Sequence, residues 1–76
     1  MIIFTGAALA YEDVLKTMSH PDLNIKGFLL KTSNGRFRVV RALGDARYAQ
    51  MCITSDLMTA KQELELMVYG TTSEWA

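Results

Sequence analysis

The chain has few of the residues that enzymes, metal sites and disulfide-linked scaffolds require. Its 76 residues include one cysteine, Cys52, and one histidine, His20. A single cysteine excludes a disulfide within the sequence, which favours a reducing compartment, and we expect a cytoplasmic protein. No apolar run approaches the roughly 18 residues that a membrane span requires. The first ten residues are apolar but lack the basic start of a secretory signal, so we interpret them as part of the fold.

Net charge is also absent, but the charges are unevenly distributed. Six of the eight lysines and arginines fall within residues 26–47, namely Lys26, Lys31, Arg36, Arg38, Arg41 and Arg47. Six cations against one acid, Asp45, give this stretch a charge of +5, so the two flanking segments are net acidic. Exposed charge of one sign attracts its complement over a Debye length of about 8–10 Å. The segregation therefore predicts that residues 26–47 meet an anionic partner.

The length fits one small domain. We expect residues 1–70 to form a compact domain and residues 71–76 to form a flexible C-terminal tail, because the helical signals end at Gly70. The pattern assigns no role to Trp75 in that tail.

The amino-terminal part of the chain predicts a helix followed by a connection. Residues 2–4 fit either a short strand or an irregular lead into the helix. A helix is predicted over Ala7–Met18, since apolar residues recur there at helical spacing and charged residues take the other side. Pro21 ends this helix, because proline disfavours helical geometry in the residue before it.

Two β-rich runs, residues 25–32 and 36–43, predict a hairpin. Ser33-Asn34-Gly35 separates them, and Asn-Gly is typical of a type I′ turn, in which both central residues have positive φ. A two-residue turn pairs Lys31 with Arg38 and Leu30 with Val39. The predicted core face then holds Phe28, Leu30, Thr32, Phe37 and Val39, and the predicted basic face holds Lys31, Ser33, Arg36 and Arg38.

A third strand over residues 47–54 and a final helix complete the pattern. The register of this strand is open, because the loop length decides which alternate set faces the core. A loop of two or four residues selects Tyr48, Gln50 and Cys52, and a loop of three selects Ala49, Met51 and Ile53. Hydrophobicity favours the second set. The helix is predicted to take its N-cap from Thr54 or Ser55 and to end at Gly70, a typical left-handed C-cap.

Together these elements predict an α+β domain. The sheet has three antiparallel strands, or four if residues 2–4 pair, and packs against two helices in the order (β)αβββα. This layout resembles the double-stranded-RNA-binding domain, and also small phage and prophage proteins that dock on host or defence complexes. The first resemblance implies a basic cluster at the start of the last helix. This chain has Ser55-Asp56-Leu57-Met58-Thr59-Ala60-Lys61 there, with one lysine and an acid.

The residues able to perform chemistry do not form a recognisable catalytic set. His20 lies in a predicted loop beside Asp22, and Cys52 lies in an apolar strand, where a free cysteine is usually buried. A nucleophile and base would require these groups to converge. Gly27 is explained by a strand irregularity and the other late glycines by turns or a cap, rather than by a phosphate-binding loop. We therefore expect no enzyme activity, no cofactor and no metal.

The basic hairpin is the strongest candidate binding surface. Guanidinium and ammonium groups suit carboxylates and phosphates. The sequence predicts a small regulatory or inhibitory module that docks an acidic protein surface, with nucleic acid as the alternative ligand. The predicted contact residues are Lys31, Arg36, Arg38, Arg47 and Tyr48, of which Tyr48 alone could stack on a base. The alternative without a binding role is that these charges only solvate the hairpin and protect its edge from pairing.

Apolar residues off the inner face of the last helix indicate a second surface. Met58, Leu66 and Tyr69 would suit a dimer mate, and zero net charge gives weak mutual repulsion. A monomer and a homodimer are both compatible with the sequence. A homodimer would place two basic hairpins on one assembly.

Overall fold

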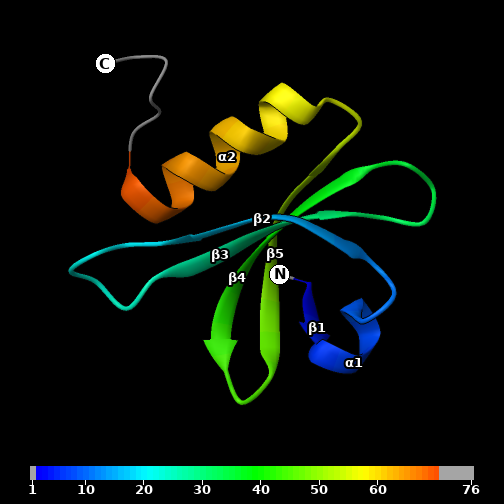
Figure 1. Cartoon of the computed structure of the whole chain (residues 1–76). Coiled ribbons are helices and arrows are strands. Elements are labelled where there is room, and N and C mark those ends of the chain that lie inside the picture. Colours follow the sequence, from blue (N-terminus) through cyan, green and yellow to red (C-terminus); the bar gives the residue numbers. More distant parts are fainter. Residues whose placement is uncertain (1, 71–76) are drawn as a thin grey trace.

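The computed structural model describes residues 2–70 as one five-stranded antiparallel sheet with a helix across one face (Figure 1). The strand order is β1-β5-β4-β3-β2. The elements are β1 (Ile3–Thr5), α1 (Gly6–Leu9), β2 (Asp13–Ser19), β3 (Lys26–Lys31), β4 (Phe37–Gly44), β5 (Arg47–Thr54) and α2 (Leu57–Tyr69). The predicted α+β class is confirmed, but the predicted sheet of three or four strands is too small. The predicted tail over residues 71–76 lies outside the described residues.

The predicted helix over Ala7–Met18 is wrong beyond its first turn. Helix α1 is four residues long, with the Thr5 side chain accepting a hydrogen bond from the backbone N–H of Ala8 at 3.3 Å. The chain then turns, and β2 pairs with β3 from Asp13↔Lys31 to Ser19↔Lys26. The apolar spacing fits either structure, but the β-branched Val14 and Thr17 suit a strand, and pairing with β3 satisfies the backbone. The second part of the first predicted helix is therefore an edge strand.

The predicted hairpin exists, but its turn has three residues instead of two. Thr32 and Arg36 close a loop over residues 33–35, with the Thr32 N–H donating to the Arg36 carbonyl at 2.8 Å. Gly35 has a φ of 81°, whereas Asn34 is not among the described non-glycine residues with positive φ. A type I turn followed by one left-handed residue is the usual form of a three-residue hairpin loop. The hydroxyl of Thr32 favours it by accepting from the Arg36 N–H at 3.0 Å.

The extra loop residue moves the register by one and changes which residues share a face. Lys31 lies opposite Phe37, and Leu30 lies opposite Arg38. Because side chains alternate between faces, the predicted core face and basic face do not exist as such. Leu29, Val39 and Phe37 pack toward α2, while Phe28, Leu30, Val40 and Arg38 lie on the opposite face.

The connection between β4 and β5 is a two-residue loop, so the favoured three-residue loop is wrong. Asp45 and Ala46 both have positive φ, 52° and 56°. Register shifts near Leu43 and Met51 then divide the candidate residues between the two faces. Ala49 is buried and Cys52 packs against the core under α2, whereas Tyr48 packs against the core on the other face. Neither predicted alternating set therefore describes β5, since Met51 and Ile53 stay exposed.

The sheet has a hydrophobic core on each face. Under α2 lie Leu29, Val39, Ala60, Leu64 and Val68. On the opposite face, Leu9 from α1 packs on Leu30 and Val40, with Phe4, Phe28 and Tyr48 around them. The helix of 13 residues covers its face more fully than the four-residue α1 covers the other. Figure 1 shows α2 toward one end of the sheet and β1 with α1 toward the other.

Helix α2 begins and ends near the predicted positions. Its N-cap is Asp56, one or two residues after the predicted Thr54 or Ser55, and its C-cap is Gly70 with a left-handed φ of 77°, as predicted. It packs closely on Gly27, where a Cβ would lie 2.7 Å from Leu64 Cδ1 and would also collide with Met67 Cε. Gly27 therefore permits the close approach of helix and strand, and the predicted strand irregularity is not found there. Among residues 2–70, no helix is both long and apolar enough to cross a membrane.

Candidate protein-interaction surfaces

Arg38 is held in a largely buried polar cluster. Its Nε donates to Oε1 of Glu12 at 3.0 Å, and the two side chains are 14% and 13% exposed. The guanidinium lies 4.5 Å from the ring centroid of Phe4, and Nη1 donates to the Gln50 side chain. Opposite charge, a ring face and an amide oxygen thus surround the cation. Arg38 contributes to the fold here and does not share a face with Lys31.

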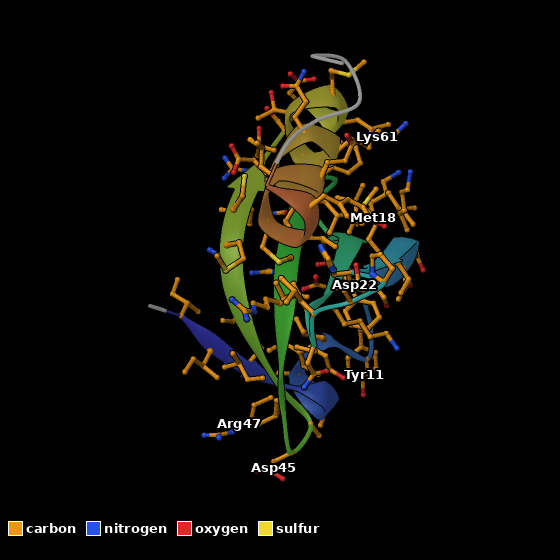
Figure 2. The ribbon with its side chains drawn as sticks, turned by 90° about the vertical axis from the view of Figure 1, so that its left-hand side faces the viewer. Tyr11, Met18, Asp22, Asp45, Arg47 and Lys61 are labelled. Atoms are coloured by element: carbon orange, nitrogen blue, oxygen red, sulfur yellow. The ribbon has the colours of Figure 1, made fainter. Side chains whose placement is uncertain are left out.

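The structure also separates Arg47 and Tyr48 from the predicted basic hairpin surface. Arg47 is exposed at the start of β5, whereas Lys31 and Arg36 lie at the end where β5 finishes. Figure 2 shows Arg47 beside Asp45 at one end of the molecule, with Lys61 on α2 at the other. Tyr48 is half-buried, with its ring edge-on to Phe28 at 5.8 Å between centroids. The five predicted contact residues therefore form no single surface.

A different group of cations lies toward one end of the sheet. Lys16 lies opposite Leu29 on β3, so Lys16 and Lys31 are diagonal neighbours on the face that α2 covers. Arg36 closes the loop after Lys31 and lies opposite Thr32, so it is at the same end of the sheet but on the face of Arg38. Lys61 lies on the flank of α2 that faces β2, as argued next. We call Lys16, Lys31, Arg36 and Lys61 the cationic corner.

The position of Lys61 follows from helical spacing. At about 100° per residue, Lys61 is about 80° from Tyr69 and about 160° from Glu63 around the helix. The Tyr69 hydroxyl donates to the Ser19 carbonyl of β2 at 3.1 Å, and Glu63 acts on the Cys52 thiol of β5. Lys61 thus belongs to the β2 flank of α2, and Figure 2 shows it on the same side as Met18. Asp13 opposite Lys31 and Glu65 one turn beyond Lys61 leave the corner with a net charge of +2.

The face opposite α2 contains an apolar hollow of about 160 Å³. It lies where α1 ends and the sheet remains partly uncovered. Its lining residues are Gly6, Leu9, Val14, Phe28, Leu30, Val40 and Tyr48. The ammonium group of Lys26 lies 5.4 Å from the ring centroid of Phe28, one of the walls. An apolar cavity with one adjacent cation can accept an apolar group that has an acidic group next to it.

The apolar residues predicted on the outside of α2 are exposed there. Met58 is 51% exposed, and Leu66 and Tyr69 are each 45% exposed. The ring of Tyr69 also contacts His20 at 5.8 Å between centroids, which ties the end of α2 to the β2–β3 connection. These residues form an α2 stripe, defined as Met58, Leu66 and Tyr69.

His20 and Cys52 are not brought together. His20 Nδ1 accepts from the backbone N–H groups of Asp22 and Leu23, each at 3.0 Å, and so shapes its own loop. Cys52 lies on β5, three strands away from β2, or about 14 Å at the usual strand spacing. Burial, and then the charge of Glu63, raise the pKa of the Cys52 thiol, which disfavours the thiolate. In residues 2–70, no three histidine, cysteine, aspartate or glutamate side chains form a metal-binding group.

No family model, curated protein or solved structure matches this chain. Sequence patterns missed the Glu12–Arg38 pair, whose partners are 26 residues apart, and the hollow, whose walls come from five elements. The sequence contains one signal for the hollow, which is the surplus of apolar residues before and within residues 13–19. The helical interpretation assigned those residues to a core.

Proposed function

We propose that this chain is a small, non-enzymatic regulatory or inhibitory module that docks an acidic surface of a protein partner through the cationic corner. The observation that supports this most directly is that β2, β3, a hairpin loop and α2 each place an exposed cation toward the same end of the sheet. Segments far apart in sequence supply these charges. The fold brings Lys16 and Lys61 toward the strand of Lys31, so this local positive charge is not visible in the overall charge of zero.

The electrostatics suit partner docking more than tight anion binding. The corner has a net charge of only +2 once Asp13 and Glu65 are counted. Exposed ion pairs contribute about 0–1 kcal/mol each, so their main effect is on encounter rate and partner choice. The rest of the affinity must come from apolar contacts with the partner. The exposed apolar residues of α2 lie next to Lys61 and are available for this role.

Nucleic acid is the alternative ligand for the same cations. Binding to single strands normally combines basic residues with exposed aromatic rings on which bases stack. Tyr48, the predicted stacking residue, is half-buried against Phe28 on the face opposite Lys16 and Lys31. This arrangement favours a protein partner over nucleic acid.

The test is charge reversal at the corner. Affinity capture with the wild-type chain identifies a candidate partner, and the purified partner is then titrated with wild type, Lys16→Glu/Lys31→Glu and the control Arg47→Glu. We expect the double variant to weaken binding about tenfold and to lose most of its salt dependence, and the control to change binding less than twofold. Equal binding by all three proteins would overturn the proposal.

Mixed DNA and RNA gel shifts at about 50 mM salt separate the alternative. Steeply salt-dependent binding to unrelated nucleic-acid sequences, lost in Lys16→Glu/Lys31→Glu, would replace the protein partner with nucleic acid. We expect no shift at micromolar protein.

A further inference from the structure

The hollow opposite α2 is an unfilled part of the second core. Leu9 is 8% exposed and fills the space over Leu30 and Val40 near α1. Beyond Leu9 the chain turns away at residues 10–12, and Val14 on β2 is 60% exposed at the margin of the hollow. The face is thus apolar and partly open. An apolar cavity of this kind loses contact energy on its open side, which an incoming apolar group would recover.

The volume selects the size of that group. Sites for drug-sized molecules and cofactors usually occupy about 300–1,000 Å³, whereas a cavity of about 150 Å³ can hold one benzene ring. The hollow, at about 160 Å³, belongs to the second class. A single aromatic side chain fits it, as in the anchor pockets that dominate many protein interfaces.

The walls of the hollow and the charges near them determine which group is favoured next to the inserted ring. Phe28 and Tyr48 meet edge-on, which leaves ring surfaces to contact a third ring. On the same face, Arg38 is neutralised by Glu12, whereas Lys26 is exposed beside Phe28. A carboxylate next to the inserted ring would therefore be favoured over a neutral or basic neighbour.

We propose that the hollow receives one aromatic side chain from an acidic segment of a partner polypeptide, with a carboxylate of that segment close to Lys26. The site lies on the opposite face of the sheet from the face that Lys16 and Lys31 share. It therefore does not depend on the cationic corner, and the proposal for either surface can be refuted without affecting the other.

The experiment uses three short probes and amide NMR spectra of the full chain. The probes are acetyl-Asp-Phe-Asp-amide, acetyl-Asp-Ala-Asp-amide and acetyl-Asn-Phe-Asn-amide. We expect the first probe to change the amide chemical shifts of Phe28, Leu30 and Tyr48. Its ring should also give intermolecular nuclear Overhauser effects to the methyl groups of Leu30 and Val40. The alanine probe should bind at least about tenfold more weakly, because it buries no ring. The asparagine probe should bind about two- to fivefold more weakly at low salt.

Three variants make the result specific. Val14→Trp places a ring at the open margin and should abolish the shifts, whereas the matched control Met58→Trp on α2 should leave them unchanged. Lys26→Gln should remove the difference between the two phenylalanine probes. Lys16→Glu/Lys31→Glu should bind all probes as wild type does, which separates this inference from the proposed function. Equal shifts by the alanine and phenylalanine probes, or ring contacts at α2 instead of Leu30 and Val40, would refute the site.

Discussion

Arg38 and Glu12 join two segments that lie 26 residues apart, with Nε of the arginine 3.0 Å from Oε1 of the glutamate. Glu12 belongs to the turn that sends the chain from α1 into β2, and Arg38 belongs to the central part of the sheet. Both side chains are largely buried, so each charge depends on the other for compensation. The pair thereby fixes the turn that replaces the predicted long helix.

Removing one partner should therefore destabilise the fold. We predict that Glu12→Gln and Arg38→Met each lower the free energy of unfolding by about 2 kcal/mol, because each leaves a largely buried group without its partner. The double variant should lose less than the sum of the two single variants. Urea unfolding of all four proteins measures this coupling, and strictly additive losses would show that the two charges do not depend on each other.

Gly27 should tolerate no side chain. A Cβ there would lie 2.7 Å from Leu64 Cδ1 and would also meet Met67, so Gly27→Ala should destabilise by about 1–3 kcal/mol. Gly6→Ala is the matched control, since its Cβ would meet nothing closer than 3.7 Å. We expect the control to stay within about 0.5 kcal/mol of wild type. A thermal or urea unfolding series that ranks the two variants in reverse would contradict the close packing.

Ala46 occupies a conformation that suits glycine better. Its φ is 56° in the two-residue loop between β4 and β5, and an alanine in the left-handed region costs about 1–2 kcal/mol. Ala46→Gly relieves this strain but gives the unfolded chain more freedom, so we predict a net gain of about 0.5 kcal/mol. Asp45→Gly should gain less, because aspartate tolerates the same region better than alanine. Urea midpoints of both variants test the order.

The N-cap of α2 should make stability depend on acidic pH. The hydroxyl of Thr59, followed by the backbone N–H of Met58, donates to Asp56 and lowers the pKa of its carboxyl group. A carboxyl whose pKa is lower in the folded state stabilises the fold above its unfolded value of about 4, and this contribution disappears as pH falls through the folded value.

Asp56→Asn retains an oxygen that can accept from Met58 but cannot ionise. We therefore predict that wild type is more stable than the variant at pH 7 and that the difference shrinks as the pH falls below the unfolded value of about 4. Urea unfolding at a series of pH values measures it. Because the other carboxyl groups are common to both proteins, a difference that stays constant with pH would contradict the role of the Asp56 charge.

The α2 stripe should support only weak self-association. A half-exposed large side chain offers about 100 Å², so the three residues offer about 300 Å², against about 800 Å² per partner in a stable interface. We predict a monomer at about 100 μM by light scattering coupled to size exclusion. A dimer at that concentration that Met58→Lys dissociates would show that a larger surface around the stripe takes part.

The final helix, α2, was predictable because its signals are local. Asp56 lies next to the predicted caps of α2, and Gly70 has the left-handed conformation that its position implied. The helical period of 3.6 residues was enough to assign the apolar residues of α2 to a face. Local signals sufficed because the helix meets the sheet along one continuous stripe.

In the amino-terminal half, the sequence fits alternative structures about equally well. Val14, Leu15 and Met18 fit a helix as well as a strand, and only pairing with β3 decides between them. The hairpin loop differed from its prediction by one residue, because Thr32 closes it through both its backbone and its hydroxyl. That single residue moved Arg38 to the face of Glu12 and dispersed the predicted basic surface. The candidate site was therefore predictable in charge but not in position.

The two edges of the sheet have unequal protection against other chains. The edge strand β2 has a register shift between Val14 and Lys16, and such a bulge discourages further pairing. At the other edge, β1 pairs only with the first part of β5, so within residues 2–70 no strand covers the outer side of Met51–Thr54. Met51 and Ile53 are exposed along this segment. Fibrils or amorphous aggregates of this protein would accordingly be expected to nucleate on the second half of β5, where a lysine in place of Ile53 would act as a gatekeeper.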